Sequence, residues 1–158
     1  MAEDPVLSEL VRALNDLYRL SGSAKVHADT VRSTGVQVTQ TGLRFLSLIA
    51  DSPRISATDL AGALDVSQPT ASRVLQQLET EQLVVRHASE LDGRVSHYVV
   101  SSKGRKALAA VHGYHVDRLA FALGDSDTAQ RKELVAAVTA LVGRLHEAQQ
   151  ASSSKRTA

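Results

Sequence analysis

Hydrophobic positions recur at helical spacing near both ends of the chain and change to strand-like runs in the middle. Within residues 5 to 33, which we predict to be one helix, leucines follow at intervals of 3, 4 and 3: Leu7, Leu10, Leu14 and Leu17. Thr39 is a suitable cap for a second helix, because a hydroxyl accepts from free N–H groups at a helix start. The buried side of that helix is marked by Leu43, Leu46 and Ile49, and its end by Asp51, Ser52 and Pro53.

Residues 55–101 combine a helix, a sharp turn, a second helix and a two-stranded hairpin. Ser56 and Asp59 have the spacing of a capping box at the first helix start. Apolar side chains then follow at helical spacing, at Leu60, Ala61 and Leu64. Asp65 marks the turn, and Val66 is the apolar residue that we expect to pack between the two helices. This order is typical of a winged helix-turn-helix, which places one helix in the DNA major groove.

The second helix of this motif has a buried face and a polar face. Ser67 is its predicted N-cap, and Pro69 lies in the first turn, where a missing N–H costs little. The apolar face consists of Ala71, Val74, Leu75 and Leu78. The predicted DNA-reading set on the entry turn and the polar face is Ser67, Gln68, Pro69, Thr70, Ser72, Arg73 and Gln76. Any solvated helix shows a polar face, so this set indicates base and phosphate contacts only together with the hairpin that follows.

The hairpin is predicted from two runs of strand-forming residues, 83–85 and 97–100, with an Asp-Gly step in the polar loop between them. Arg94 lies near the loop tip, where a guanidinium can enter the narrow minor groove. Asp92 stands two residues earlier and can orient Arg94 by a charge-assisted hydrogen bond. Directly after a recognition-type helix, this triplet favours DNA binding.

Residues 67–108 resemble the MarR (multiple antibiotic resistance regulator) family of bacterial transcription factors. The resemblance is carried by a Thr/Ser-rich helix with an Arg, a leucine-glutamate helix end, a D-x-R wing and a Ser-x-x-Gly step: Thr70, Ser72 and Arg73; Leu78, Glu79 and Leu83; Asp92 and Arg94; Ser101 or Ser102 with Gly104. With the flanking helices it covers about residues 5 to 148. It implies a homodimeric regulator on a pseudo-palindromic operator, usually a repressor that a small ligand releases. Many relatives have more basic residues on the reading face than this chain has.

Helices also follow the wing. Lys103 to Leu123 reads as one long helix despite Gly113, and Gly124 suits its C′ position. A last helix from Thr128 repeats the 4, 3, 4 spacing at Leu134, Val138, Leu141 and Leu145. We therefore predict a mainly α fold with a small β-hairpin wing (α+β). Residues 36–102 would form the winged helix-turn-helix, 5–35 and 103–148 a helical dimerisation region, and 149–158 a disordered tail. The periodicity of the terminal helices alone fits an intramolecular core as well as a dimer interface. We favour the dimer, because two copies of the DNA-binding helix can read the two halves of a palindrome.

Composition agrees with a compact regulator. The chain has 158 residues, of which 43% are hydrophobic, and its net charge is +1. DNA affinity must therefore come from local placement of charge. From residue 66 to 106 there are six basic residues, Arg73, Arg86, Arg94, Lys103, Arg105 and Lys106, against four acidic ones, Glu79, Glu81, Glu90 and Asp92. A generic soluble surface can carry the same small excess.

Several classes of protein are not expected. Cysteine is absent, which excludes disulfides and a thiol switch. No signal peptide is evident, and no apolar run approaches the ~20 residues that span a bilayer, so we expect a cytoplasmic protein without membrane contact. No phosphate-binding glycine loop, H-E-x-x-H motif or nucleophile elbow is present. We expect neither an enzyme nor a cofactor.

The histidines and arginines of the flanking helices leave alternatives open. His112 and His115 stand three apart and could share a metal ion with His27, Asp29, Asp16 or Asp117, although we expect no metal and read them as interface or solvent-exposed histidines. For a small-molecule effector between the dimerisation helices and the winged domain, the predicted polar groups are Arg19, His27, Arg44 and His115. A metal-responsive regulator, a winged-helix protein-interaction module and an architectural DNA binder remain the alternatives.

Overall fold

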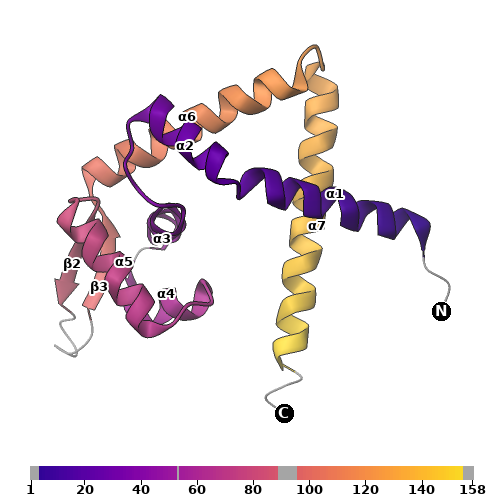
Figure 1. The fold of residues 1–158 in the computed structure, drawn as a ribbon. Helices are drawn as coiled ribbons and strands as arrows, with labels where there is room; N and C mark the ends of the chain where they lie inside the picture. The colour runs from indigo at the N-terminus through magenta and orange to yellow at the C-terminus, as the bar shows by residue number, and fades with distance from the viewer. Residues whose placement is uncertain (1–3, 53, 89–95, 155–158) are drawn as a thin grey trace. The chain divides into compact units, whose positions relative to one another are not determined.

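The computed structural model describes residues 4–52, 54–88 and 96–154 (Figure 1). These residues form seven α-helices and three β-strands. The chain divides into two compact units, residues 1–117 and 118–158. The first unit holds the winged helix together with the N-terminal helices and the first part of α6. In order, the elements are α1 (Pro5–Ser21), α2 (Ala24–Thr34), α3 (Gln40–Ala50), β1 (Ile55–Ser56), α4 (Ala57–Ala63), α5 (Gln68–Thr80), β2 (Val84–Ala88), β3 (Ser96–Val100), α6 (Ser102–Leu123) and α7 (Thr128–Ser154).

The first predicted helix is wrong in one respect, because residues 5–33 form two helices. The break lies at Gly22 and Ser23, between α1 and α2. Ser23 accepts a hydrogen bond from the Val26 N–H at 3.2 Å and its hydroxyl donates to the Leu20 carbonyl at 3.1 Å. A good N-cap beside a glycine, the poorest helix former after proline, ends one helix and starts the next.

The helix-turn-helix has the predicted caps. Thr39 and Ser67 accept from backbone N–H groups at the starts of α3 and α5. Ser56 and Asp59 form the full capping box of α4. The chain then leaves α4 through Asp65, whose φ is +52°, and the Val66 N–H donates back to the Ala61 carbonyl at 3.0 Å. This is a Schellman turn, and the apolar residue after it packs against the core as predicted.

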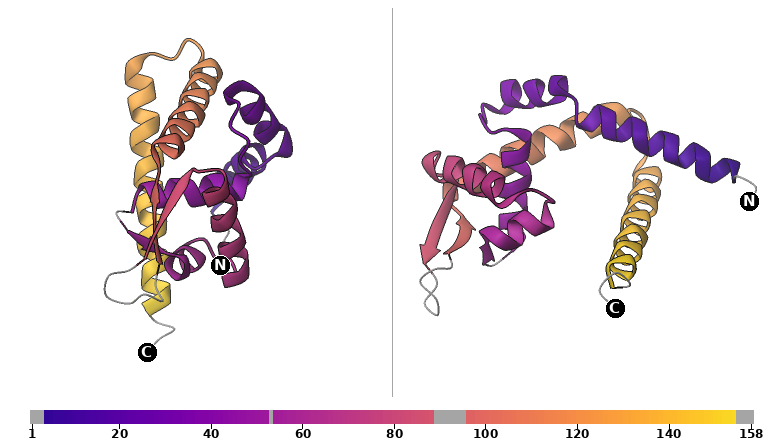
Figure 2. Two further views of the ribbon diagram at one scale, coloured as in Figure 1. Left: turned by 90° about the vertical axis from the view of Figure 1, so that its left-hand side faces the viewer. Right: turned by 60° about the horizontal axis from the view of Figure 1, so that its bottom comes forward.

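The wing is confirmed as a hairpin, and it has an additional strand that the sequence did not predict. Strands β2 and β3 pair antiparallel, with Val84 opposite Val100 and Ala88 opposite Ser96. Two further views of the ribbon include this hairpin (Figure 2). The short β1 adds to the other side of β3, with Ile55 opposite Tyr98, so the sheet order is β1-β3-β2. Two residues are too few to show a period-2 pattern, which is why sequence reasoning missed β1.

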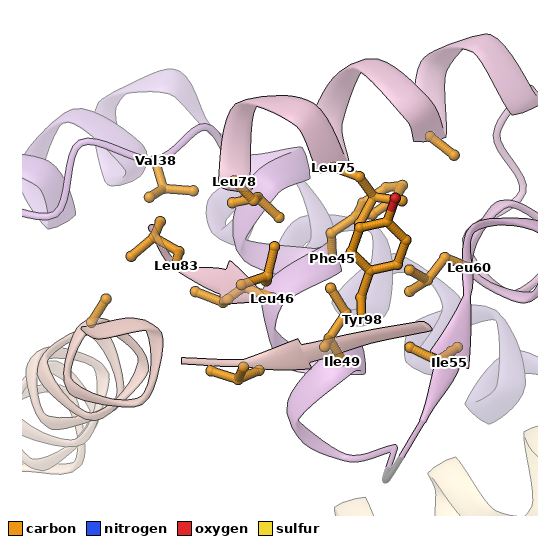
Figure 3. Close-up of a cluster of buried hydrophobic side chains, with 14 of the residues drawn as sticks. Val38, Phe45, Leu46, Ile49, Ile55, Leu60, Leu75, Leu78, Leu83 and Tyr98 are labelled. Carbon is orange, nitrogen blue, oxygen red and sulfur yellow. The ribbon is translucent and has the colours of Figure 1, made fainter. Parts of the chain in front are cut away.

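One hydrophobic core holds the helix-turn-helix and the sheet together (Figure 3). Its fully buried large side chains come from α3, α4 and α5: Phe45, Leu46, Ile49, Leu60, Leu75 and Leu78. Tyr98 adds its ring from the central strand. Because α5 and the hairpin share this core, their relative orientation is fixed by close packing.

The C-terminal helices begin and end close to the predicted positions. Helix α6 continues through Gly113 and ends before Gly124, which has a φ of +48°. Helix α7 starts at Thr128 as predicted but runs to Ser154. The prediction of a disordered tail from residue 149 is therefore wrong for residues 149–154, and residues 155–158 lie outside the described part.

Candidate nucleic-acid interface

The N-terminal turn of α5 is built by side-chain capping. The Thr70 N–H donates to the Ser67 hydroxyl at 3.3 Å, and the two hydroxyls lie 2.8 Å apart. Pro69 occupies the first turn, where no intrahelical N–H donor is needed. The helix start is thus fixed by its own residues, which leaves its outward side chains available.

The predicted reading set lies on one side of α5, opposite the core. Ala71, Leu75 and Leu78 are buried, and Val74 is half-buried. Of the seven predicted residues, Thr70 is half-buried and six are exposed: Ser67, Gln68, Pro69, Ser72, Arg73 and Gln76. The arrangement presents one guanidinium, two amides and the Ser72 hydroxyl along a little more than two helical turns, with the Ser67 hydroxyl already bonded as the N-cap. Such groups are suited to base edges and phosphates.

The wing begins beside this helix, and its strands are linked by a side-chain bond. Arg86 on β2 donates from Nε to the Ser96 hydroxyl on β3 at 2.8 Å. The sequence showed Arg86 only as one basic residue among several, because the register that brings it to Ser96 is a property of the sheet. Asp92 and Arg94, the predicted wing residues, lie outside the described residues.

Two titratable groups in this region have shifted pKa values. The Ser56 hydroxyl donates to the Asp59 carboxylate at 2.6 Å, and the Ser56 N–H donates to the same carboxylate at 3.3 Å. These two bonds lower the pKa of Asp59, and nearby His97 lowers it by a smaller amount. Burial raises the pKa of the Tyr98 phenol, which is only 7% exposed. Asp59 is exposed at the start of α4 and Tyr98 is buried in the core, so both groups belong to the scaffold of the interface.

The four residues predicted for an effector site line one cavity of about 640 Å³ in the first unit. Arg19 comes from α1, His27 from α2, Arg44 from α3 and His115 from α6. The residues that line it include no carboxylate, although Arg19 pairs with Asp16 at 2.6 Å. The sequence did not indicate the remaining wall, which includes Tyr18, Gly22, Val26, Thr30, Gln40 and Leu43. The helix break at Gly22, which the sequence analysis missed, contributes directly to this wall.

Metal ligands do not gather in the described part of the chain. No group of three or more histidine, aspartate or glutamate side chains there has the geometry to hold an ion. His112 and His115 are both exposed on α6, and the His115 ring lies 5.7 Å from that of Tyr114. In the same described residues, no helix is both long and apolar enough to cross a bilayer.

Comparison with known proteins shows what this fold resembles. Residues 38–96 match the model of the MarR family. Among solved structures, RV1404 from Mycobacterium tuberculosis is 23% identical, with a TM-score of 0.71 over 90% of this chain and 95% of that one. A MepR mutant from S. aureus bound to an oligodeoxyribonucleotide is 18% identical, with a TM-score of 0.59 over 88% of this chain and 97% of the other. FabT from Streptococcus pneumoniae, solved in complex with DNA, is also 18% identical, with a TM-score of 0.59 over 90% and 96%.

No curated protein sequence matches the chain. The three solved structures share the fold over 88–90% of the chain, and the family match falls on the helix-turn-helix and the first strand of its hairpin. This segment is therefore similar to the MarR family, and the solved structures show that the chain shares their fold.

Proposed function

We propose that this protein is a homodimeric, sequence-specific repressor that binds a pseudo-palindromic operator in the cytoplasm and is released by a small aromatic or lipophilic ligand. The observation that carries the proposal is the outward face of α5, where six of the seven predicted reading residues are exposed. The same core holds this helix and the hairpin. The MepR mutant and FabT, which share the fold, were both solved with DNA.

Arg73 and Gln76 are the residues best suited to read bases. They stand three apart on α5, so both project from the same side of the helix. A guanidinium can donate two bonds to guanine, and a glutamine amide can pair with adenine. No ion pair or hydrogen bond from the Arg73 side chain to another described residue is present, so binding DNA would not require a protein contact to be broken there. From the wing, Arg94 is proposed to enter the minor groove, with Asp92 orienting it.

A homodimer would cover an apolar seam that a single chain leaves in water. Leu7 and Leu17 on α1 are 58% and 59% exposed, and Leu10 and Leu14 are 38% and 37% exposed. On α7, Leu134, Val138 and Leu145 are 46%, 50% and 55% exposed. Contiguous apolar stripes of this kind on two helices mark an interaction surface. Two copies would also present two α5 helices to the two halves of a palindrome.

The cavity lined by Arg19, His27, Arg44 and His115 supports the ligand response. Its volume of about 640 Å³ falls within the usual range for small-molecule sites. Its wall combines apolar residues such as Leu43 and Val26 with cationic groups and without a carboxylate. Such a site favours a small molecule with an apolar body and an acidic group. Because four helices contribute to it, an occupant would bias their arrangement.

DNA titration by fluorescence anisotropy tests the function. Wild type, Arg73→Ala and Arg94→Ala would be compared near 150 mM salt on DNA from upstream of the gene and on scrambled DNA, and random-site selection would supply an operator if that DNA lacks one. We expect tight binding to one sequence, weakened by about 1–3 kcal/mol in Arg73→Ala. Arg32→Ala, which removes the same charge from α2, is the matched control and should bind like wild type.

Equal, weak binding to all DNAs, unchanged by either substitution, would contradict the proposal. The outward face of α5 and the wing would then be a protein-docking surface, the alternative that the same exposed residues allow.

A further inference from the structure

The end of the recognition helix is bonded to the start of α6. Three consecutive carbonyls, those of Glu81, Gln82 and Leu83, each accept a hydrogen bond from residues 101–103. The Lys103 ammonium donates to the Glu81 carbonyl at 2.8 Å. Ser101 donates twice, from its hydroxyl to the Gln82 carbonyl at 2.7 Å and from its backbone N–H to the Leu83 carbonyl at 3.0 Å. We call residues 81–83 and 101–104 the α5–α6 junction.

These bonds use the carbonyls at and just beyond the C-cap of α5, Glu81. The last carbonyls of a helix have no intrahelical donor, and here α5 closes with a Schellman turn in which Leu83 donates to Leu78 at 2.9 Å. That turn satisfies carbonyls inside α5, whereas the three carbonyls that follow accept from Ser101, just before α6, and from Lys103 in its first turn. Ser101 in turn accepts from the Gly104 N–H at 2.9 Å, so one side chain caps α6 and holds the end of α5.

Elsewhere the two helices make little direct contact. Helices α5 and α6 are not among the element pairs with appreciable contacts in the described residues. A second cavity of about 530 Å³ lies at the junction, lined from the α5 end by Glu81 and Leu83 and from α6 by Lys103, Lys106 and Ala107. The junction therefore supplies hydrogen bonds between the end of the reading helix and the start of α6, in addition to the core contact of Ala107.

We propose that Ser101 and Lys103 are positioning residues for DNA recognition, because they make α5 and α6 turn as one rigid body. This inference rests on the proposed function, in which α5 reads DNA. The same α6 carries His115 into the larger cavity. A displacement of α6 at that cavity would therefore be transmitted to the end of α5 through the three bonds. Ser101 and Lys103 would affect DNA recognition in this way without contacting DNA themselves.

Two neighbouring lysines provide a matched test. Lys103→Met and Lys106→Met remove the same charge one turn apart on α6, but in the described residues only Lys103 bonds the α5 end. Each variant would be titrated on selected operator DNA and on scrambled DNA, with melting temperatures measured alongside. We expect Lys103→Met to reduce the operator-to-scrambled affinity ratio about fivefold or more. Lys106→Met should weaken binding to both DNAs alike and leave the ratio unchanged. Equal ratios for the two variants would overturn the proposal.

Amide hydrogen exchange tests the junction without DNA. Ser101→Ala should speed exchange at the Gln82 and Leu83 amides relative to those of Phe45 and Leu46 in the core. Ser102→Ala is the control one residue away, and Ser101→Thr, which keeps the hydroxyl, should restore wild-type exchange and the DNA affinity ratio. Unchanged exchange at residues 82–83 in Ser101→Ala would refute the link. If wild type binds no DNA selectively, the proposed function fails, while the exchange result still decides whether α5 and α6 are coupled.

Discussion

Gly104 lies directly against the carbonyl oxygen of Leu83, so close that a Cβ on Gly104 would stand 2.1 Å from that oxygen. The same atom would meet the Val100 side chain at 2.7 Å. Since a backbone carbonyl cannot rotate away as a flexible side chain can, no residue other than glycine fits here without a backbone shift. The Ser-x-x-Gly step of the sequence is thus explained by the close approach of α6 to the end of α5.

Gly104→Ala is expected to destabilise the protein by about 3 kcal/mol, the upper range for forced overpacking. Gly113→Ala on the same helix is the matched control, because a Cβ there meets no atom within 4 Å. Replacing a helical glycine in open space should raise the free energy of unfolding by about 0.5–1 kcal/mol. Urea unfolding of both variants measures the difference. A Gly104→Ala protein as stable as wild type would show that the junction is looser than described.

Gln82→Gly is expected to stabilise the protein slightly. Gln82 has a φ of +60° at the C′ position of the Schellman turn, a conformation that costs a residue with a side chain about 1 kcal/mol. Glycine removes this strain, although its freer unfolded chain offsets part of the gain. The melting temperature should therefore rise, whereas Gln82→Ala, which keeps the strain, should not raise it. A lower melting temperature for Gln82→Gly would contradict this account.

The stability of the α4 start should depend on acid pH. The folded-state pKa of Asp59 is lowered, chiefly by the two donors of Ser56. The ionised form is thus favoured by folding, and its contribution is present above the unfolded pKa of about 4 and is lost as the pH falls through the lower folded value. Asp59→Asn should therefore reduce the free energy of unfolding more at pH 7 than at pH 2.5. Denaturant titrations at the two pH values check this; an equal loss at both would mean that the carboxylate contributes nothing as an ion.

Leu14→Asp is expected to convert the proposed dimer to a monomer. An aspartate in the apolar seam of α1 would be buried without a partner in the dimer, which costs several kcal/mol. Light scattering should give the mass of one chain for Leu14→Asp. Arg12→Asp changes a nearby exposed residue of α1 outside the leucine seam and should leave twice that mass. A wild type that already scatters as one chain would refute the dimer itself.

Arg44→Ala is expected to abolish the response to an acidic effector while leaving DNA binding in place. The residue lines the larger cavity and belongs to α3, outside the predicted reading set. A thermal-shift screen of small aromatic acids should find compounds that stabilise wild type, weaken its DNA binding and do neither to Arg44→Ala. Thr34→Ala, outside the residues that line this cavity, is the control. If no compound does both to wild type, the ligand-release proposal fails.

The sequence by itself determined the features that depend on neighbouring residues. Ser67 and the Ser56–Asp59 pair correctly predicted the starts of their helices, because a cap bonds N–H groups only two or three residues away. The faces of α5 followed from its period, since burial at Ala71, Leu75 and Leu78 repeats with the helical turn. The Asp65–Val66 turn was likewise readable from residue types.

Only the tertiary structure decided what distant segments do to one another. The pairing of Ile55 with Tyr98 and the bond from Lys103 to Glu81 join residues more than twenty positions apart, and no local pattern encodes which partner is met. The cavity lined from four helices depends on the break at Gly22. The regular leucine spacing predicted one continuous helix, whereas Ser23 caps a second helix that starts there. Local capping and periodicity act within a helical turn, whereas register, close approach and cavities result from packing the whole core at once.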